Sequence, residues 1–167
     1  DNISPSPARF DMKKLYWVNS EHIKRTDNKK LALLVVKLLH KKQVIPDSSL
    51  NLEAIIDLLK TRVDNLNTLA HDVAYFYQPL TPSPDDVAKH LSLDARNLLG
   101  SFASELRELN TWSLEGIKQL VKDFCTKQQI KMPQLGMPLR LKLCGTTQSP
   151  SFDAVIFLFP VLPKLQI

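Results

Sequence analysis

Apolar residues recur at intervals of three and four along nearly all of this 167-residue chain, and this periodicity limits its fold more than any other feature. Such spacing places apolar side chains on one face of an α-helix, where they can be buried. The clearest runs are Leu31, Leu34, Val35, Leu38 and Leu39; Leu52, Ile55, Ile56, Leu59 and Val63; Leu66, Leu69, Val73 and Phe76; Leu98, Leu99, Phe102, Leu106 and Leu109; and Leu114, Ile117, Val121, Phe124 and Cys125. A shorter helix before them would bury Leu15 and Val18. The sequence therefore predicts an all-α protein.

Residues that favour helix ends separate these runs. A side-chain oxygen can accept from the first backbone amides of a helix at Asp11, at Thr26 or Asp27, at Ser49 or Asn51, at Ser83, at Thr111 or Ser113, and at Ser151. Pro46 would stop the second helix and Pro160 the last one, because proline cannot continue a helix. The expected helices are therefore short and separately capped.

The strongest break in the pattern is a cluster of prolines at Pro79, Pro82 and Pro84. Proline removes amide donors and disfavours helix in the residue before it. We place a domain division here. It predicts two consecutive helical subdomains, residues 23–80 and 81–167, after a short segment 1–22.

One segment fits two structures. Between residues 139 and 143 leucines alternate with Arg140 and Lys142, and a period of two predicts a strand. Pro138 equally suits the first position of a short helix that ends at Gly145. The pattern alone leaves both structures open.

Composition argues against several functional classes. No apolar run approaches the roughly 18 residues that span a bilayer, and the first residues lack the pattern of a signal peptide. Four glycines cannot build a glycine-rich phosphate loop. Cys125 and Cys144 read as buried or half-buried free thiols, and the four histidines show no metal-ligand spacing with them. We expect a cytoplasmic protein without a metal site, and the absent initiator Met suggests a fragment.

The net charge of +5 is unevenly distributed. Residues 1–42 hold ten Lys and Arg against four Asp and Glu, residues 43–117 hold five against eleven, and residues 118–142 hold six against one. Two basic blocks on either side of an acidic centre suit a ligand with two negative contact regions, such as a folded RNA. The block from residue 24 to 42 would follow phosphates, and its candidate contacts are Lys24, Arg25, Lys30, Lys37 and Lys41. Solvated helix faces explain the same charges without a ligand.

Several short motifs stand in a distinctive order. They are Ser6-Pro7-Ala8-Arg9-Phe10-Asp11, Leu15-x-Trp17-x-Asn19, Arg62 with Leu66, Tyr75-Phe76-Tyr77, and the segment Gly136–Pro150. In this order and spacing they resemble the C-terminal anticodon-binding region of bacterial, proteobacterial-like glutamyl-tRNA synthetases, over about residues 7–158. The resemblance implies two helical subdomains, makes residues 1–22 the end of the stem-contact region, and favours helix at residues 138–145. It weakens after Phe157, where the family continues into a longer final helix.

The resemblance also implies roles for individual residues. Arg62 matches the arginine that reads the third anticodon base, and a planar guanidinium suits a base edge. The other matching positions are Lys122 and Arg140, as basic contacts to the anticodon loop, and Ser149, Pro150 and Phe152, as a turn against the first two bases. From the residues alone, Arg62 could instead form a surface ion pair with Asp57 or Asp64. The aromatic triplet, Trp17 and Trp112 read as packing residues.

No catalytic residue is predicted in this chain, because neither the HIGH-type nor the KMSKS-type motif of a class I synthetase is present. The fragment itself needs no cofactor. Its parent would attach glutamate to glutamate tRNA with ATP and magnesium, and would act as a monomer with its catalytic domain in the same polypeptide. Two alternatives stay open, which are a stand-alone helical RNA-binding protein and a helical protein–protein interaction module.

Overall fold

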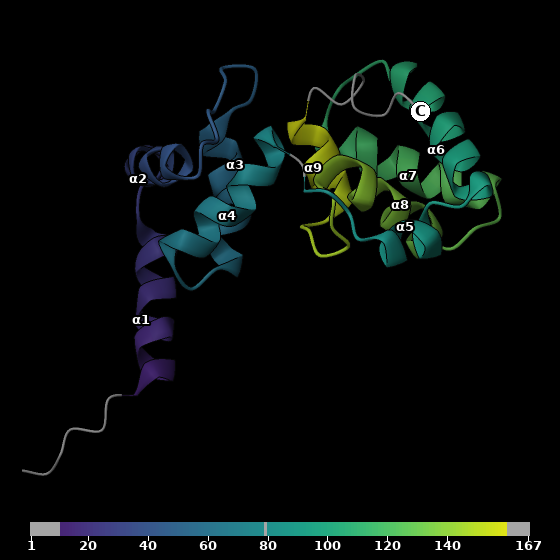
Figure 1. Ribbon diagram of the computed structural model, residues 1–167. Helices are drawn as coiled ribbons and strands as arrows, with labels where there is room; N and C mark the ends of the chain where they lie inside the picture. Colours follow the sequence, from purple (N-terminus) through teal and green to yellow (C-terminus); the bar gives the residue numbers. More distant parts are fainter. Residues whose placement is uncertain (1–10, 79, 160–167) are drawn as a thin grey trace, which may run out of the picture.

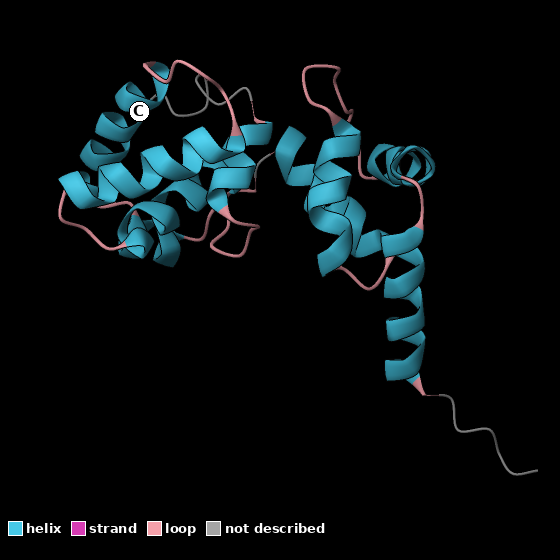
Figure 2. Cartoon of the chain, turned by 180° about the vertical axis from the view of Figure 1, so that it is seen from behind, coloured by secondary structure: helices cyan, strands magenta, loops and turns pink. Residues whose placement is uncertain are grey.

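Helical periodicity is confirmed by the computed structural model, which describes residues 11–78 and 80–159. Within these residues the regular structure is entirely helical (Figures 1 and 2). The elements are α1 (Met12–Arg25), α2 (Asn28–Lys41), α3 (Leu52–Leu59), the 3-10 helix η1 (Lys60–Arg62), α4 (Leu66–Tyr77), α5 (Pro84–His90), α6 (Leu93–Arg107), α7 (Leu114–Lys127), α8 (Met132–Cys144) and α9 (Phe152–Leu158). The motif at residues 6–10 and the predicted stop at Pro160 lie outside the described residues.

Local side-chain caps explain where most helices begin. Asp11 accepts from the amide of Lys13 at 3.0 Å, and Asp27 caps α2 in the same way. Of the alternative cap residues, Asn51 caps α3 and Ser113 caps α7. Ser83 caps α5, with Pro84 in its first turn. Ser151 precedes α9 without a side-chain cap bond.

The helices form two groups (Figure 1). Helices α2, α3 and α4 pack together, and α6 to α9 pack together with α5 against α8. One continuous hydrophobic core joins them, including stacked rings of Phe76 and Phe159 with centroids 4.9 Å apart. The amide of Leu80 also donates to the carbonyl of Cys144 at 3.1 Å. The proposed division near residue 80 therefore separates two groups that share a packed interface.

Gly145 shows how closely the two groups approach each other. It ends α8 in the left-handed region, with φ of +72°, and a Cβ at this position would collide with the backbone of Leu80. Glycine is needed here for two reasons, since it tolerates positive φ and leaves room for the neighbouring chain.

The predicted packing of Leu15, Trp17 and Leu34 is wrong, and so is the predicted end of the second helix at Pro46. Leu15 and Trp17 are 45% and 64% exposed, and Leu34 is also exposed. The main tertiary contact of α1 is with η1, so most of this helix extends away from the core (Figure 1). Helix α1 spans Met12–Arg25 and therefore includes the boundary that we propose after residue 22. Helix α2 ends before Pro46, at a turn where Gln43 has φ of 60°.

The segment around Pro138 is helical, as the resemblance favours, but the helix is longer than predicted. Helix α8 begins at Met132, with Pro133 in its first turn, and Pro138 lies inside it. Proline in a helix interior leaves one carbonyl without its intrahelical partner and is normally costly. Seven residues of α8 are buried, including Pro138 itself, so tertiary packing holds this helix together.

Candidate nucleic-acid interface

Arg62 lies at the end of a tight connection between α3 and α4. Helix α3 buries Ile55, Ile56 and Leu59, and the chain then tightens into η1 before Val63 returns to the core. This sequence of buried and exposed positions leaves the side chain of Arg62 in solvent. The backbone around it is therefore fixed, while the guanidinium is accessible.

The neighbouring carboxylates have other partners. Asp57 accepts from Asn28 at 3.0 Å and pairs with Lys60 at 3.2 Å, and the hydrogen bond from Asn28, followed by that from Lys60, lowers the pKa of Asp57. Asp64 accepts from the side-chain amide of Asn65 at 2.7 Å. Within residues 11–78 and 80–159, no ion pair joins Arg62 to either carboxylate. The surface ion pair considered from sequence is therefore not formed.

Two further contacts place the Arg62 region. The side-chain amide of Asn19 donates to the carbonyl of Asp64 at 2.7 Å, which ties α1 to the turn after η1. Tyr75 on α4 is buried, and burial is the main cause that raises its pKa. The positive charge of Arg62 acts in the opposite direction and lowers the pKa of Tyr75. The aromatic triplet thus supports this region from inside, as predicted.

Arg140 is held in a different way. It lies half-buried on α8, with its guanidinium carbon 5.8 Å from the ring centroid of Phe152. Nη1 donates only to the weak sulfur acceptor of Met137, at 3.9 Å, and the buried Nε has no hydrogen-bond partner. A buried donor without a protein partner costs free energy.

The turn after α8 completes this second site. Phe152 is 7% exposed, and its ring lies so close to Gly136 that a Cβ there would be 2.8 Å from the ring edge. Pro150 is also buried, whereas Ser149 is half-buried and its hydroxyl donates to the carbonyl of Pro150 at 3.0 Å. Phe152 and Pro150 therefore act as the floor of the site, with Arg140 above Phe152.

The remaining predicted contacts are dispersed. Lys122 is exposed on α7, and no described contact brings it to Arg140. Lys24 and Arg25 pair with Glu21 at 2.9 and 3.7 Å, and the hydrogen bond and charge of Lys24 are the main causes of the lowered pKa of Glu21. Lys30, Lys37 and Lys41 are exposed and lie seven and four positions apart, which places them along one face of α2. The face that carries these three lysines also exposes Leu33 and Leu34 between Lys30 and Lys37.

Sequence reasoning missed the roles of Gly136 and Met137. Both were part of the Gly136–Pro150 motif, but Gly136 makes room for the ring of Phe152 and Met137 contacts Arg140. A glycine in a helix interior is unfavourable, and this is the signal that could have indicated a close approach.

Trp112 was expected to pack, but it is 40% exposed, and its ring nitrogen donates to the carbonyl of Phe157 at 3.1 Å. Both cysteines are buried thiols outside any disulfide, as expected. Across the described part of the chain, His, Cys, Asp and Glu do not gather into a possible metal site, and no helix is long and apolar enough to cross a membrane.

These features describe an all-α module that presents two arginines to a ligand. Arg62 is exposed after η1, and Arg140 is half-buried beside the turn between α8 and α9. Comparison with known proteins agrees, since a family model described as an anticodon binding domain matches residues 30–160. The chain belongs to this family, in the form found in the C-terminal part of bacterial glutamate–tRNA ligases.

Relatives among curated proteins give the same result. The chain is 46% identical to glutamate–tRNA ligases of a Neisseria meningitidis serogroup C strain and of Chromobacterium violaceum, over 94% and 93% of its length. It spans only 34% of each of these relatives, or about a third. A solved glutamate tRNA ligase from Elizabethkingia meningosepticum shares the fold, with a TM-score of 0.79 and 19% identity over 93% of this chain and 32% of that one.

Proposed function

We propose that this chain recognises the anticodon loop of glutamate tRNA as part of a longer glutamate–tRNA ligase. The observation that carries the proposal is the state of Arg140, whose buried Nε lacks a partner directly above Phe152. Arg140 is half-buried, so the accessible part of its guanidinium can donate to a base edge, and single-stranded RNA loops are read by bases that unstack and bond in this way.

Each site has its own task in this proposal. Arg62, exposed and without an ion pair in the described residues, reads the edge of the third anticodon base. Arg140 and Ser149 contact the first two bases, with Pro150 and Phe152 as the surface beneath them. A guanidinium can form two parallel bonds to one base edge, which gives about 1–3 kcal/mol of discrimination.

The lysines position the RNA without reading it. Lys122 would contact the loop as a point charge, and Lys30, Lys37 and Lys41 would follow phosphates along α2, joined by Lys24 and Arg25 once the RNA competes with Glu21. Neutralising phosphates releases counterions, so affinity should fall steeply with salt.

The activity of the whole enzyme is also part of the proposal. The parent would join glutamate to its tRNA in the cytoplasm, as a monomer, with ATP and magnesium bound by its catalytic domain. This chain would bind and discriminate, and the chemistry would occur elsewhere in the same polypeptide.

A binding titration with anticodon variants tests the proposal. Wild-type chain is titrated against glutamate tRNA transcripts that differ at one anticodon base. Arg62→Gln should reduce discrimination at the third base by about 1–3 kcal/mol, while Lys122→Ala weakens all transcripts equally. If Arg62→Gln lowers affinity for every transcript by the same factor, Arg62 does not read a base.

The salt dependence of binding distinguishes tRNA recognition from the alternative function, a protein–protein interaction module. Log affinity against log salt should have a steep negative slope if phosphates are contacted. A helical protein-interaction module would show no affinity for the transcripts at low salt, and that result would overturn the proposal.

A further inference from the structure

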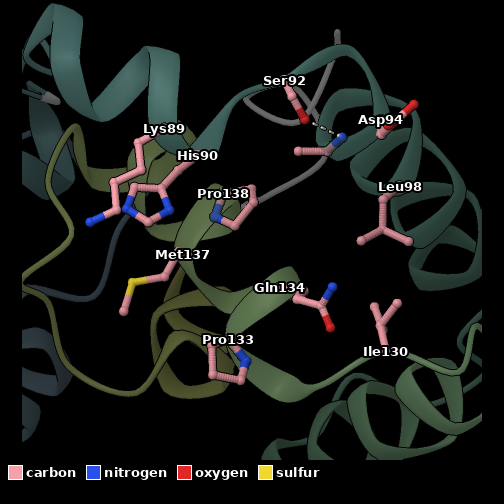
Figure 3. Close-up of a pocket in the computed structure, with 11 residues that line it drawn as sticks. Lys89, His90, Ser92, Asp94, Leu98, Ile130, Pro133, Gln134, Met137 and Pro138 are labelled. Carbon is pink, nitrogen blue, oxygen red and sulfur yellow. Dashed lines mark hydrogen bonds between the residues drawn. The ribbon is translucent and has the colours of Figure 1, made fainter.

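A pocket of about 610 Å³ lies between α5, α6 and α8, next to the Arg140 site, with which it shares only Met137 (Figure 3). This volume is typical of small-ligand sites, which occupy roughly 300–1,000 Å³. Its wall includes His90, Leu98, Ile130, Gln134, Met137 and Pro138. None of the roles proposed above uses this pocket.

The wall of the pocket suits a planar, partly polar group. Leu98 and Ile130 lie together on one side in Figure 3, and Met137 lies on the other. Such side chains provide apolar contact for the faces of a ring. Gln134 adds one directed polar group, because its side-chain oxygen already accepts from the amide of Lys131 at 2.8 Å. Its NH₂ is then the part that can donate to a ligand.

The rim carries positive charge at one end. Lys89 and His90 stand at the end of α5, and in the part of the chain that the structure describes neither forms an ion pair. The carboxylate of Asp94 points away from the centre of the pocket in Figure 3. A phosphate beside Lys89 would therefore meet a cation, with the nearest acidic group of the rim turned outward.

The pocket and the Arg140 site share a wall on α8. Met137 lines the pocket and accepts, through its sulfur, from Nη1 of Arg140 at 3.9 Å. A strand of RNA whose bases occupy the Arg140 site would thus pass directly by this opening. Neighbouring nucleotides are within reach, whereas a separate small molecule would need its own route and its own charge partner.

We propose that the pocket binds one unstacked nucleotide of the tRNA loop that lies outside the anticodon triplet. Its base would insert between Leu98 and Met137, with an acceptor on its edge facing Gln134, and its phosphate would contact Lys89. This inference rests on the proposed function and extends it, because it adds a readout position beyond the three anticodon bases.

The test uses the full chain and glutamate tRNA transcripts that carry 2-aminopurine at one loop position at a time, outside the triplet. A base that leaves the stack changes its fluorescence on binding. Ala95→Phe should fill the pocket from α6 without removing any lining group, and Asn97→Phe is the matched control on an exposed part of the same helix. Gln134→Ala, with Gln128→Ala as control, tests the polar contact separately.

We expect one labelled position to respond to wild-type chain and to lose that response in Ala95→Phe, together with about tenfold weaker binding. Gln134→Ala should weaken binding about fivefold while the controls bind normally. Discrimination among anticodons should persist in both pocket variants. The persistence separates loss of the pocket from loss of the fold.

Two results would overturn the inference in distinguishable ways. If wild-type chain discriminates among anticodons but neither pocket variant changes affinity or fluorescence, the pocket does not bind RNA and the proposed function stands. If wild-type chain shows no affinity for any transcript, the proposed function fails and the inference fails with it.

Discussion

Arg62 and Arg140 are proposed for the same task, yet the molecule holds them differently. Arg62 projects into solvent from a 3-10 turn, and only the backbone determines its direction. Arg140 is half-buried over Phe152, with its Nε unpaired. A buried, packed guanidinium loses less freedom when it binds, but it lowers the stability of the free protein. Function and stability should therefore be separable at Arg62 and linked at Arg140.

The largest loss of stability should come from removing the ring of Phe152, which lies beneath Arg140. Phe152→Ala deletes a buried ring that packs on Gly136, so we expect the free energy of unfolding to fall by about 3–5 kcal/mol. Urea denaturation measures it. Phe157→Ala is the matched control, because Phe157 is 39% exposed on the same helix. Equal losses in the two variants would show that Phe152 supports nothing particular at this site.

A smaller loss of stability should follow from changing Gly145, which contacts Leu80 between the two helix groups. Gly145→Ala forces an alanine into positive φ and against the backbone of Leu80, and should cost about 2–3 kcal/mol. Thermal unfolding measures the loss. Gly100→Ala, inside α6, should instead be neutral or stabilising, because alanine favours helix more than glycine does. An unchanged melting temperature for Gly145→Ala would mean that the two groups can separate at this contact without cost.

Local chemistry explains what the sequence could predict of this fold. Helix periodicity and side-chain caps act within a few residues, and the caps at Asp11, Asp27 and Ser83 are where the pattern places them. Burial depends on distant partners. The apolar stripe of α1 therefore predicts a buried face around Leu15 that the structure leaves exposed, since α1 extends away from the core.

The candidate site could be predicted only in part for the same reason. Its residues came from a resemblance, but their arrangement depends on packing between α8 and α9. No spacing along the chain shows that Phe152 lies against Gly136, or that this contact places a ring beneath Arg140. The prolines of α8 likewise predicted a short helix. Local rules cannot account for a longer helix that packing against its neighbours stabilises.

Replacing each arginine by methionine tests the comparison directly. Arg140→Met keeps apolar packing on Phe152 and removes the unpaired Nε, so stability should rise by about 1 kcal/mol while tRNA binding weakens. Arg62→Met should weaken discrimination with stability unchanged within about 0.5 kcal/mol. Denaturation and tRNA titration of the same samples give both quantities. If Arg140→Met is less stable than wild type, the guanidinium contributes to folding and the contrast is wrong.

The smallest expected effect on stability concerns Asp57, whose carboxylate is already paired with Asn28 and Lys60. Hydrogen bonds from Asn28 and then from Lys60 lower the pKa of Asp57, so its ionised form is favoured in the folded state. Stability from this group is therefore present above the pKa of the unfolded state and is lost as pH falls through the folded pKa. Asp57→Asn should be slightly less stable than wild type at pH 7, and the difference should disappear at acidic pH. Urea denaturation at several pH values measures it, and Asn28→Ala should remove most of the pH dependence, because Asn28 is the largest cause of the shift. If the difference between wild type and Asp57→Asn is the same at every pH, the ionised carboxylate does not contribute to stability.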